Sequence, residues 1–160
     1  MSGLRYGGFW LRAWAFLLDA LVLLPLVWLA RFAAGVAYEE LLSRTVLDAA
    51  GEAFSRYQAL HGLARDLLGL GLPWLYFAVL EGFGGASLGK RIAGLRVRDA
   101  EGRPIGPLRS AWRNLVKPLS LGCCCGGLLL AAWTARKRAL HDWLSGTVVV
   151  REGSVPAGPA

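Results

Sequence analysis

Residues 10–34 read WLRAWAFLLDALVLLPLVWLARFAA, an apolar stretch that holds one acidic residue, Asp19, well inside it. A transmembrane helix needs about 20 mostly apolar residues, so this stretch is long enough to span a bilayer. A charged side chain at that depth is costly unless it is paired or hydrated. We therefore expect a retained membrane helix rather than a signal peptide, with Asp19 as the leading functional candidate.

Two further apolar stretches follow, at residues 67–83 and 115–133. The second of these contains Pro118 and three consecutive cysteines, Cys123–Cys125. The chain is 55% hydrophobic, and its mean hydropathy of +0.44 is high for a soluble domain. The sequence therefore predicts an all-α polytopic membrane protein with two full transmembrane helices, 10–34 and 67–83. The third apolar element, 115–133, is expected to be broken or re-entrant.

Charged residues are distributed unevenly between these stretches. Residues 35–66 carry three basic and five acidic side chains, whereas residues 82–117 carry eight basic and two acidic ones. The positive-inside rule places 84–114 and the N-terminus in the cytoplasm and 35–66 outside, in a multi-pass protein of the cell (inner) membrane. Residues 35–66 are expected to form an amphipathic helix across the top of the spans. Because the basic residues flank apolar spans, the net charge of +7 indicates anionic lipid headgroups, not nucleic acid.

Two short runs have the composition of β-strands, GLRVRD at 94–99 and GTVVVR at 146–151. Neither is stable alone. Three simple crossings would place residues 136–138 outside, whereas both runs lie in the cytoplasm if they pair, which is the arrangement that we favour. That pairing requires the apolar element 115–133 to enter the membrane and return. Pro118 and Gly122 would supply the break. Residues 152–160 are expected to form a disordered tail.

Three segments closely resemble the RDD family of small prokaryotic membrane proteins: YGGFWLRAWAFLLD (6–19), YFAVLEGFGGASLGKRIAGLRVRDAEGRP (76–104) and RKRALHDWLSGTVVV (136–150). The family is named for one arginine and two aspartates, which correspond here to Arg12, Asp19 and Asp142. The run Gly89-Lys90-Arg91 with the strand after it is the most specific part. The resemblance implies a single membrane domain over residues 1–151. Sodium/proton exchange has been proposed for some members, and that is the activity it implies.

Asp19, Arg12 and Glu81 are the candidates for an ion- or proton-binding site. Arg12 and Asp19 lie seven residues apart, so they share a helix face about 10.5 Å apart along the axis. They could meet through extension of Arg12 or through a water. Asp19 either binds a proton or cation or is fixed to a basic residue of another segment. Glu81, at the end of the second span, is either part of the ion path or simply solvated or paired.

Arg109, Arg113 and Lys117 recur every four residues and predict one basic helix face. The simpler interpretation is a helix held to anionic lipid headgroups. The alternative is that Arg113 is the counter-ion of Asp19.

Residues 84–90 read GGASLGK and match the first part of a phosphate-binding loop. Arg91 stands where that loop needs Ser or Thr, and no strand precedes it, so nucleotide binding is not predicted. We expect the glycines to turn the chain at the membrane surface, with Lys90 and Arg91 facing headgroups. Asp142 is expected to cap the final helical turn or to pair with Lys90 or Arg91.

No cofactor or metal site is predicted. A metal site at His141 would need further ligands, and the one other histidine in the chain is His61, in the segment 35–66. The spacing of Cys123–Cys125 fits neither a metal site nor a disulfide. Without a converging nucleophile and base, the sequence predicts no enzyme. Two functions remain: transport of H⁺ or a small cation such as Na⁺, and an accessory or scaffold role in another membrane complex. Either is expected to need a homo-oligomer or a membrane-protein partner.

Overall fold

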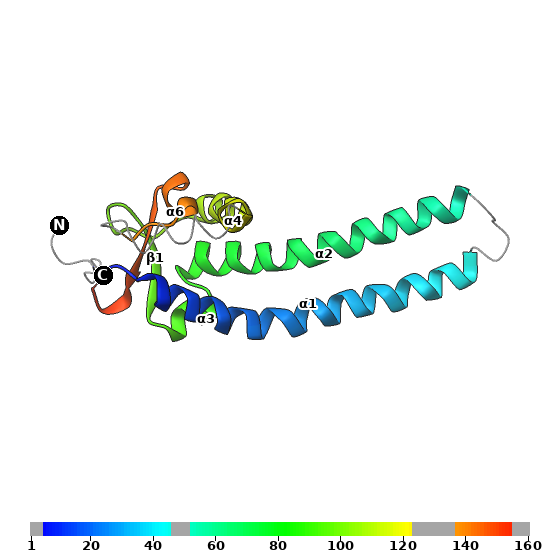
Figure 1. Cartoon of the computed structure of the whole chain (residues 1–160), viewed down its shortest axis with the longest axis horizontal. Coiled ribbons are helices and arrows are strands. Elements are labelled where there is room, and N and C mark those ends of the chain that lie inside the picture. The colour runs from blue at the N-terminus through cyan, green and yellow to red at the C-terminus, as the bar shows by residue number, and fades with distance from the viewer. Residues whose placement is uncertain (1–4, 46–51, 123–136, 155–160) are drawn as a thin grey trace. The chain divides into compact units, whose positions relative to one another are not determined.

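The computed structural model describes residues 5–45, 52–122 and 137–154. The elements in chain order are α1 (Phe9–Thr45), α2 (Glu52–Gly84), α3 (Leu88–Ile92), β1 (Leu95–Asp99), α4 (Pro107–Gly122), α6 (Leu140–Leu144), β2 (Thr147–Arg151) and the 3₁₀ helix η1 (Glu152–Ser154) (Figure 1). They form two compact units. The terminal unit comprises Met1–Ala20 and Trp74–Ala160, and the middle unit comprises Leu21–Pro73. The expected mostly helical fold with a small strand pair is confirmed.

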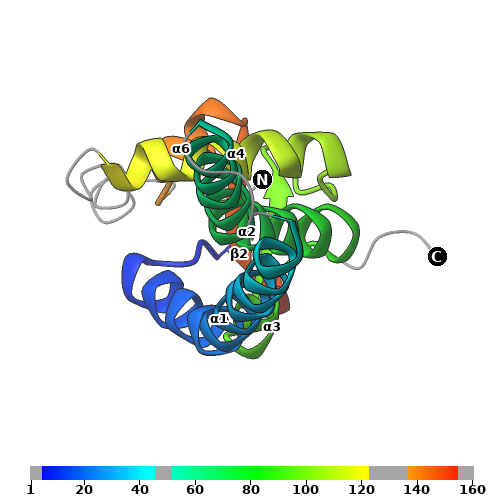
Figure 2. The same cartoon turned by 90° about the vertical axis from the view of Figure 1, so that its right-hand side faces the viewer.

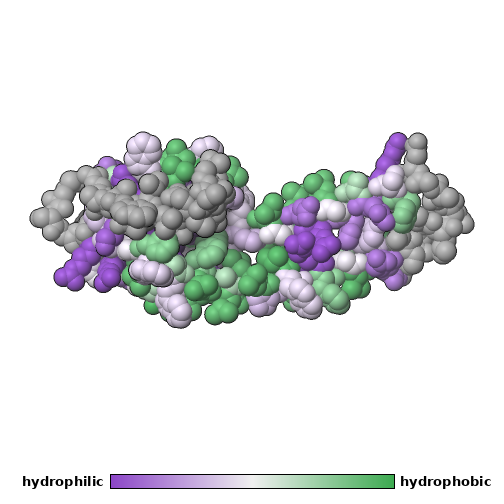
Figure 3. Space-filling model, in the orientation of Figure 1, coloured by the Kyte–Doolittle hydropathy of each residue, from purple (hydrophilic) through white to green (hydrophobic). Residues whose placement is uncertain are grey.

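Helices α1 and α2 are long enough and apolar enough to span a membrane, over Phe9–Leu41 and Phe54–Gly84. With 37 and 33 residues they measure about 55 and 50 Å at about 1.5 Å per residue, more than a ~30 Å hydrocarbon core requires. Only 17% of the most apolar part of each helix is buried within the protein. Apolar surface extends along much of the stretch occupied by α1 (Figure 3). A bilayer would cover these side chains, which a soluble fold would have to bury.

The expectation of a separate helix over residues 35–66 is wrong. Its described residues are helical, but they continue α1 as far as Thr45 and extend α2 from Glu52 onward. Glu39, Glu40 and Leu41 are good helix formers, and no proline interrupts the chain there, so α1 continues beyond its apolar part. The second long helix is correspondingly much longer than the predicted span 67–83.

The third apolar element is described only in its first part, as α4. This helix is amphipathic: Ser110, Asn114 and Val116 are buried, whereas Leu108 and Trp112 are exposed. Residues 123–136, which include Cys123–Cys125 and the expected return of the chain, lie outside the described residues, as do residues 155–160. Residues 152–154 form η1, so this part of the expected disordered tail is ordered.

Strands β1 and β2 pair antiparallel, with Leu95 opposite Arg151 and Asp99 opposite Thr147, which confirms the predicted strand pair. A bridge between Tyr6 and Val150 adds the segment before α1 to β2. Buried residues Ala15, Leu95, Val97, Ile105 and Val149 form the core of the terminal unit. Helix α3 lies beside the first turns of α1, and α4 lies beside α6 (Figure 2).

Candidate functional site

Asp142 is the centre of a buried charge network in the terminal unit. It is the third residue of α6, and its Oδ2 accepts a hydrogen bond of 3.1 Å from the backbone N–H of Ala139, which fixes the start of that helix. Its Oδ1 accepts from Arg113 Nη2 at 2.6 Å and Nε at 3.1 Å, while its Oδ2 pairs with Arg12. Asp142 therefore joins α6 to both α1 and α4.

Arg12 is held by backbone as well as by Asp142. Its Nε donates to the carbonyl of Gly7 at 2.9 Å, and its Nη2 donates to the carbonyl of Lys137 at 2.6 Å. All three guanidinium nitrogens thus bind protein groups. Arg12 and Asp19 share the helix face as predicted, but the bonding partners of Arg12 lie elsewhere, so these two residues form no pair.

Glu81 is fully buried and is shared by three cations. Arg113 pairs with Oε2, and Lys90 pairs with Oε1. Lys117 reaches Oε1 at 3.2 Å, and Asn114 donates to Oε2 at 3.3 Å. Because Arg113 contacts both Glu81 and Asp142, the end of α2 belongs to the same network as α1, α4 and α6. Glu81 is therefore paired rather than solvated, and its place on an ion path stays a prediction.

Asp19 is only 1% exposed and has neutral partners. Its Oδ1 accepts from the Tyr76 hydroxyl at 2.7 Å and from the backbone N–H of Gly89 at 2.7 Å. Its Oδ2 accepts from the Ser87 hydroxyl at 2.6 Å. Within residues 5–45, 52–122 and 137–154, no cation lies within ion-pair distance of Asp19.

Gly89 brings α3 against α1. A Cβ at this position would collide with the backbone carbonyl of Ala15 and would lie 2.9 Å from Cγ of Asp19. Only glycine allows this approach, so Asp19 can accept a hydrogen bond from the backbone N–H of Gly89 in the first turn of α3, where Ser87 is the N-cap residue. The GGASLGK run therefore holds α3 to α1.

Burial and neighbouring charges lower the pKa values of two α6 side chains, Asp142 and His141. Burial alone would raise the pKa of Asp142, but the adjacent Arg113 and Arg12 outweigh it and hold that pKa well below its usual value. Burial lowers the pKa of His141 to about 3, and nearby Asp142 offsets this only in part. Asp142 is therefore ionised and His141 neutral at physiological pH.

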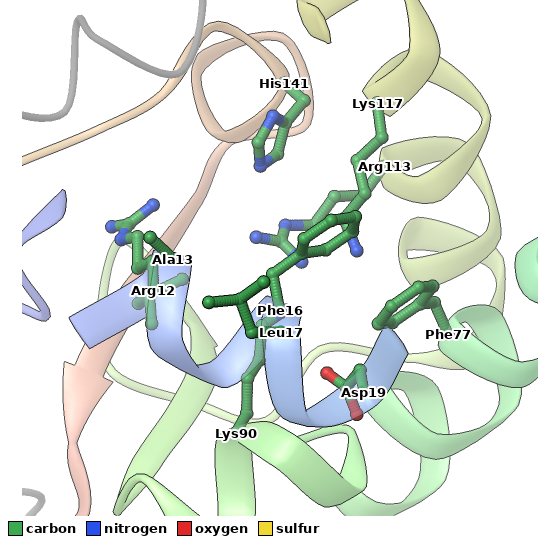
Figure 4. Close-up of a pocket in the computed structure, with 11 residues that line it drawn as sticks. Arg12, Ala13, Phe16, Leu17, Asp19, Phe77, Lys90, Arg113, Lys117 and His141 are labelled. Atoms are coloured by element: carbon green, nitrogen blue, oxygen red, sulfur yellow. The ribbon is translucent and has the colours of Figure 1, made fainter. Parts of the chain in front are cut away.

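A cavity of about 300 Å³ lies beside this network, wholly within the terminal unit (Figure 4). Its apolar lining comprises Ala13, Phe16, Leu17, Phe77 and Val149, and its polar lining comprises Arg12, Asp19, Lys90, Arg113, Lys117 and His141. Asp19 lies at one end and His141 at the other (Figure 4). The cavity thus connects the neutral hydrogen-bonding site of Asp19 with the charge network.

Arg109, Arg113 and Lys117, which were predicted to form one basic helix face, differ in their exposure to solvent. Arg109 is exposed, but Arg113 is buried between Glu81 and Asp142 and cannot reach a headgroup, and Lys117 is largely buried. The alternative that made Arg113 the counter-ion of Asp19 is not what the structure shows.

The structure also differs from the expected pairing of Asp142 and from the expected contact of Lys90 with headgroups. Asp142 caps the start of α6, as one expectation had it, but its cations are Arg12 and Arg113, not Lys90 or Arg91. Lys90 is buried against Glu81, whereas Arg91 is exposed. Burial lowers the pKa of Lys90, and the charge of Glu81 opposes this shift.

Sequence reasoning missed three polar residues of the site: Tyr76, Ser87 and Asn114. Ser87 stands two residues before Gly89 at the start of a helix, a position where serine is a common N-cap, so a local signal existed. Tyr76 and Asn114 carried no such signal. In the described part of the chain, no three residues of the metal-ligating types come together.

Two long apolar helices and a small β-bearing unit with a buried Arg–Asp–Arg–Glu network define a small, mostly helical membrane protein. The model of the RDD family matches residues 6–146, so the chain belongs to the RDD family. The residues that carried the resemblance, Arg12, Asp19 and Asp142, all lie in the buried part of the terminal unit. No curated protein and no solved structure gives a significant match.

Proposed function

We propose that this protein moves protons or small cations such as Na⁺ across the cell membrane, with Asp19 as the ion-binding group. The observation that carries the proposal is the bonding of Asp19. It is a buried carboxylate beside a cavity, with three neutral donors and no cation partner among the described residues. A carboxylate in such a position within an apolar helix favours a functional role.

Two of the three partners of Asp19 suit a group that gains and loses a proton. The hydroxyls of Tyr76 and Ser87 donate to the carboxylate, but a hydroxyl can also accept. When Asp19 is protonated, its new O–H can donate to one of these oxygens while the N–H of Gly89 keeps its place. Both protonation states are then hydrogen-bonded in one geometry. The same carboxylate and hydroxyl oxygens are of the kind that hard cations prefer.

The proposed topology is multi-pass, with the N-terminus in the cytoplasm. The eight basic residues of 82–117 support it through the positive-inside rule. The pairing of β1 with β2 supports an even number of crossings between residues 99 and 147, because the two strands lie on one side of any membrane. Anionic headgroups would contact exposed basic residues such as Arg109.

Ion flux through sealed proteoliposomes tests the transport proposal. Proton movement is followed with an internal pH dye after a sodium or potassium jump, for the wild type, Asp19→Asn and Glu101→Gln. The last variant removes an exposed carboxylate of the same unit. We expect equal flux from the wild type and Glu101→Gln and at least tenfold less from folded Asp19→Asn. Absence of flux from folded wild type, or full flux from Asp19→Asn, would contradict the proposal.

The second candidate is an accessory or scaffold subunit, acting as a homo-oligomer or with a membrane-protein partner. Its support comes from large apolar side chains that are exposed outside the two candidate spans, such as Leu108 on α4 and Trp143 on α6. It predicts that the protein co-purifies in a defined stoichiometry with another membrane protein, or with itself, and shows no flux alone. Cross-linking through a cysteine placed at Leu108, followed by mass spectrometry, would identify the contact.

A further inference from the structure

The cavity beside the charge network reaches the apolar surface of α1. Phe16 and Leu17 line it, yet each is more than half exposed, at 52% and 55%. Both belong to the candidate span Phe9–Leu41, where hydrocarbon would surround them. A ligand that enters past these two residues therefore comes from the membrane rather than from water. A volume of about 300 Å³ is at the lower end of the range for ligand-binding sites.

Positive charge exceeds negative charge around this cavity. Four cations line it, namely Arg12, Lys90, Arg113 and Lys117. They share two carboxylates, Glu81 and Asp142, and the third nearby carboxylate, Asp19, binds neutral donors instead. Burial lowers the pKa of Lys117 to about 7, and a bound anion would stabilise the charged form of its ammonium, so this excess of basic groups favours an anion at the cavity.

Lys117 is the cation best placed to bind that anion. Its ammonium carries three N–H donors, and one contact with Glu81, at 3.2 Å, is its ion pair. The ammonium lies 3.9 Å from the centre of the Phe77 ring, at the boundary between the charged and apolar parts of the lining. Its side chain is 18% exposed, whereas that of Arg113 is 1% exposed.

His141 supplies a further polar group at the same cavity, and one of its ring nitrogens has no partner among the described residues. It is only 6% exposed, and its Nδ1 is buried with no hydrogen-bond partner among the described residues. Its Nε2 lies 3.5 Å from Oδ1 of Asp142, which favours the proton on Nε2 and leaves Nδ1 as an acceptor. A buried acceptor without a partner is costly, and a ligand hydroxyl would satisfy it.

We propose that this cavity binds one anionic phospholipid, with its phosphate at Lys117 and an acyl chain packed against Phe16, Leu17 and Phe77. A glycerol headgroup adds the hydroxyl that His141 requires, so phosphatidylglycerol is the probe of choice. The lipid occupies a defined internal site, distinct from the loose attraction of headgroups to exposed Arg109. The inference does not depend on ion transport, because it concerns the apolar lining and Lys117 rather than Asp19.

Native mass spectrometry of the full chain in detergent tests this inference. Phosphatidylglycerol and phosphatidylcholine with identical acyl chains are titrated in parallel, and singly bound protein is quantified. We expect the wild type to bind phosphatidylglycerol at least tenfold more tightly. Lys117→Gln should abolish this preference. The matched control Arg109→Gln, which removes an exposed charge from the same helix, should retain it.

A second variant tests the hydrocarbon part without changing any charge. Ala13→Leu adds bulk to the apolar lining of the cavity and should weaken phosphatidylglycerol binding about tenfold. If circular dichroism shows that Lys117→Gln does not fold, Ala13→Leu tests lipid binding at the cavity in its place. Equal affinity for the two lipids, equal loss in Arg109→Gln and Lys117→Gln, or unchanged binding to Ala13→Leu would each overturn the proposal. Displacement by equimolar glycerol phosphate would also overturn it, since it would identify a soluble anion as the ligand.

Discussion

At the residue scale, buried charges connect the elements of the terminal unit, and Asp142 is the one that joins α6 to both α1 and α4. It has two arginines and a backbone N–H as partners and no exposed surface. Removing one member of a buried ion pair leaves the others uncompensated, which is far more costly than the net gain from forming the pair. The network therefore fixes the positions of α1, α4 and α6 more than it adds to stability.

Asp142→Asn should lower the free energy of unfolding by about 3–5 kcal/mol, because Arg12 and Arg113 would lose their shared anion. Glu152→Gln breaks an exposed pair with Arg96 and should cost less than about 1 kcal/mol. Thermal unfolding in detergent, followed by circular dichroism, compares the two. Equal destabilisation would show that Asp142 is not the centre of the network.

Asp19 shows which part of a site local sequence can predict. An acidic residue inside an apolar run is conspicuous because its cost follows from its immediate neighbours. Its partners Tyr76 and Ser87 lie 57 and 68 residues away, so no local pattern connects them to it. The same limit explains why Arg113 seemed a suitable partner for Asp19 but binds Glu81 and Asp142 instead.

At the scale of elements, α3 depends on a single close approach. The five-residue helix is too short to be stable alone, and it is held where Gly89 meets Ala15 and Asp19. The strand pair was predictable because alternating and β-branched residues mark strands locally. The great length of α1 and α2 was not predicted, since charged residues beyond the apolar parts indicated a separate surface helix.

Gly89→Ala should lower the free energy of unfolding by about 1–3 kcal/mol, because its Cβ would collide with the carbonyl of Ala15. Gly106→Ala is the matched control, since a Cβ there meets nothing within 4 Å. Chemical unfolding of both variants in detergent measures the difference. If Gly106→Ala were equally destabilising, the close approach of α3 to α1 would not be the cause.

At the scale of the whole molecule, buried His141 makes the folded state sensitive to acid. Its folded pKa of about 3 lies below the ordinary value of 6.5, so the unfolded chain binds a proton first as the pH falls. The contribution of neutral His141 to folding stability is therefore fully present above about pH 6.5 and is lost progressively as the pH falls towards 3. The charged groups around His141 are Asp142, Arg113, Lys117 and Lys90.

Lowering the pH from 7 to 5 should reduce the wild-type stability by about 2 kcal/mol through His141 alone, at about 1.36 kcal/mol per pH unit below 6.5. His141→Gln should remove most of that slope. Unfolding midpoints at pH 7, 6 and 5 give the comparison. The pKa of Asp142 is held well below its usual value, so this carboxylate keeps its charge over that range. An unchanged slope in His141→Gln would assign the acid sensitivity to other groups.

The pairing of Arg12 with Asp142 joins residues 130 positions apart and has a consequence for synthesis. At about 5–20 residues per second, roughly 6–26 seconds separate the translation of these two residues. During that time Arg12 lacks its carboxylate, and β1 lacks the strand with which it pairs. In the nascent chain, the first part of the charge network therefore stays without its carboxylate until residue 142 has been translated, and the terminal unit can complete its fold only after that point.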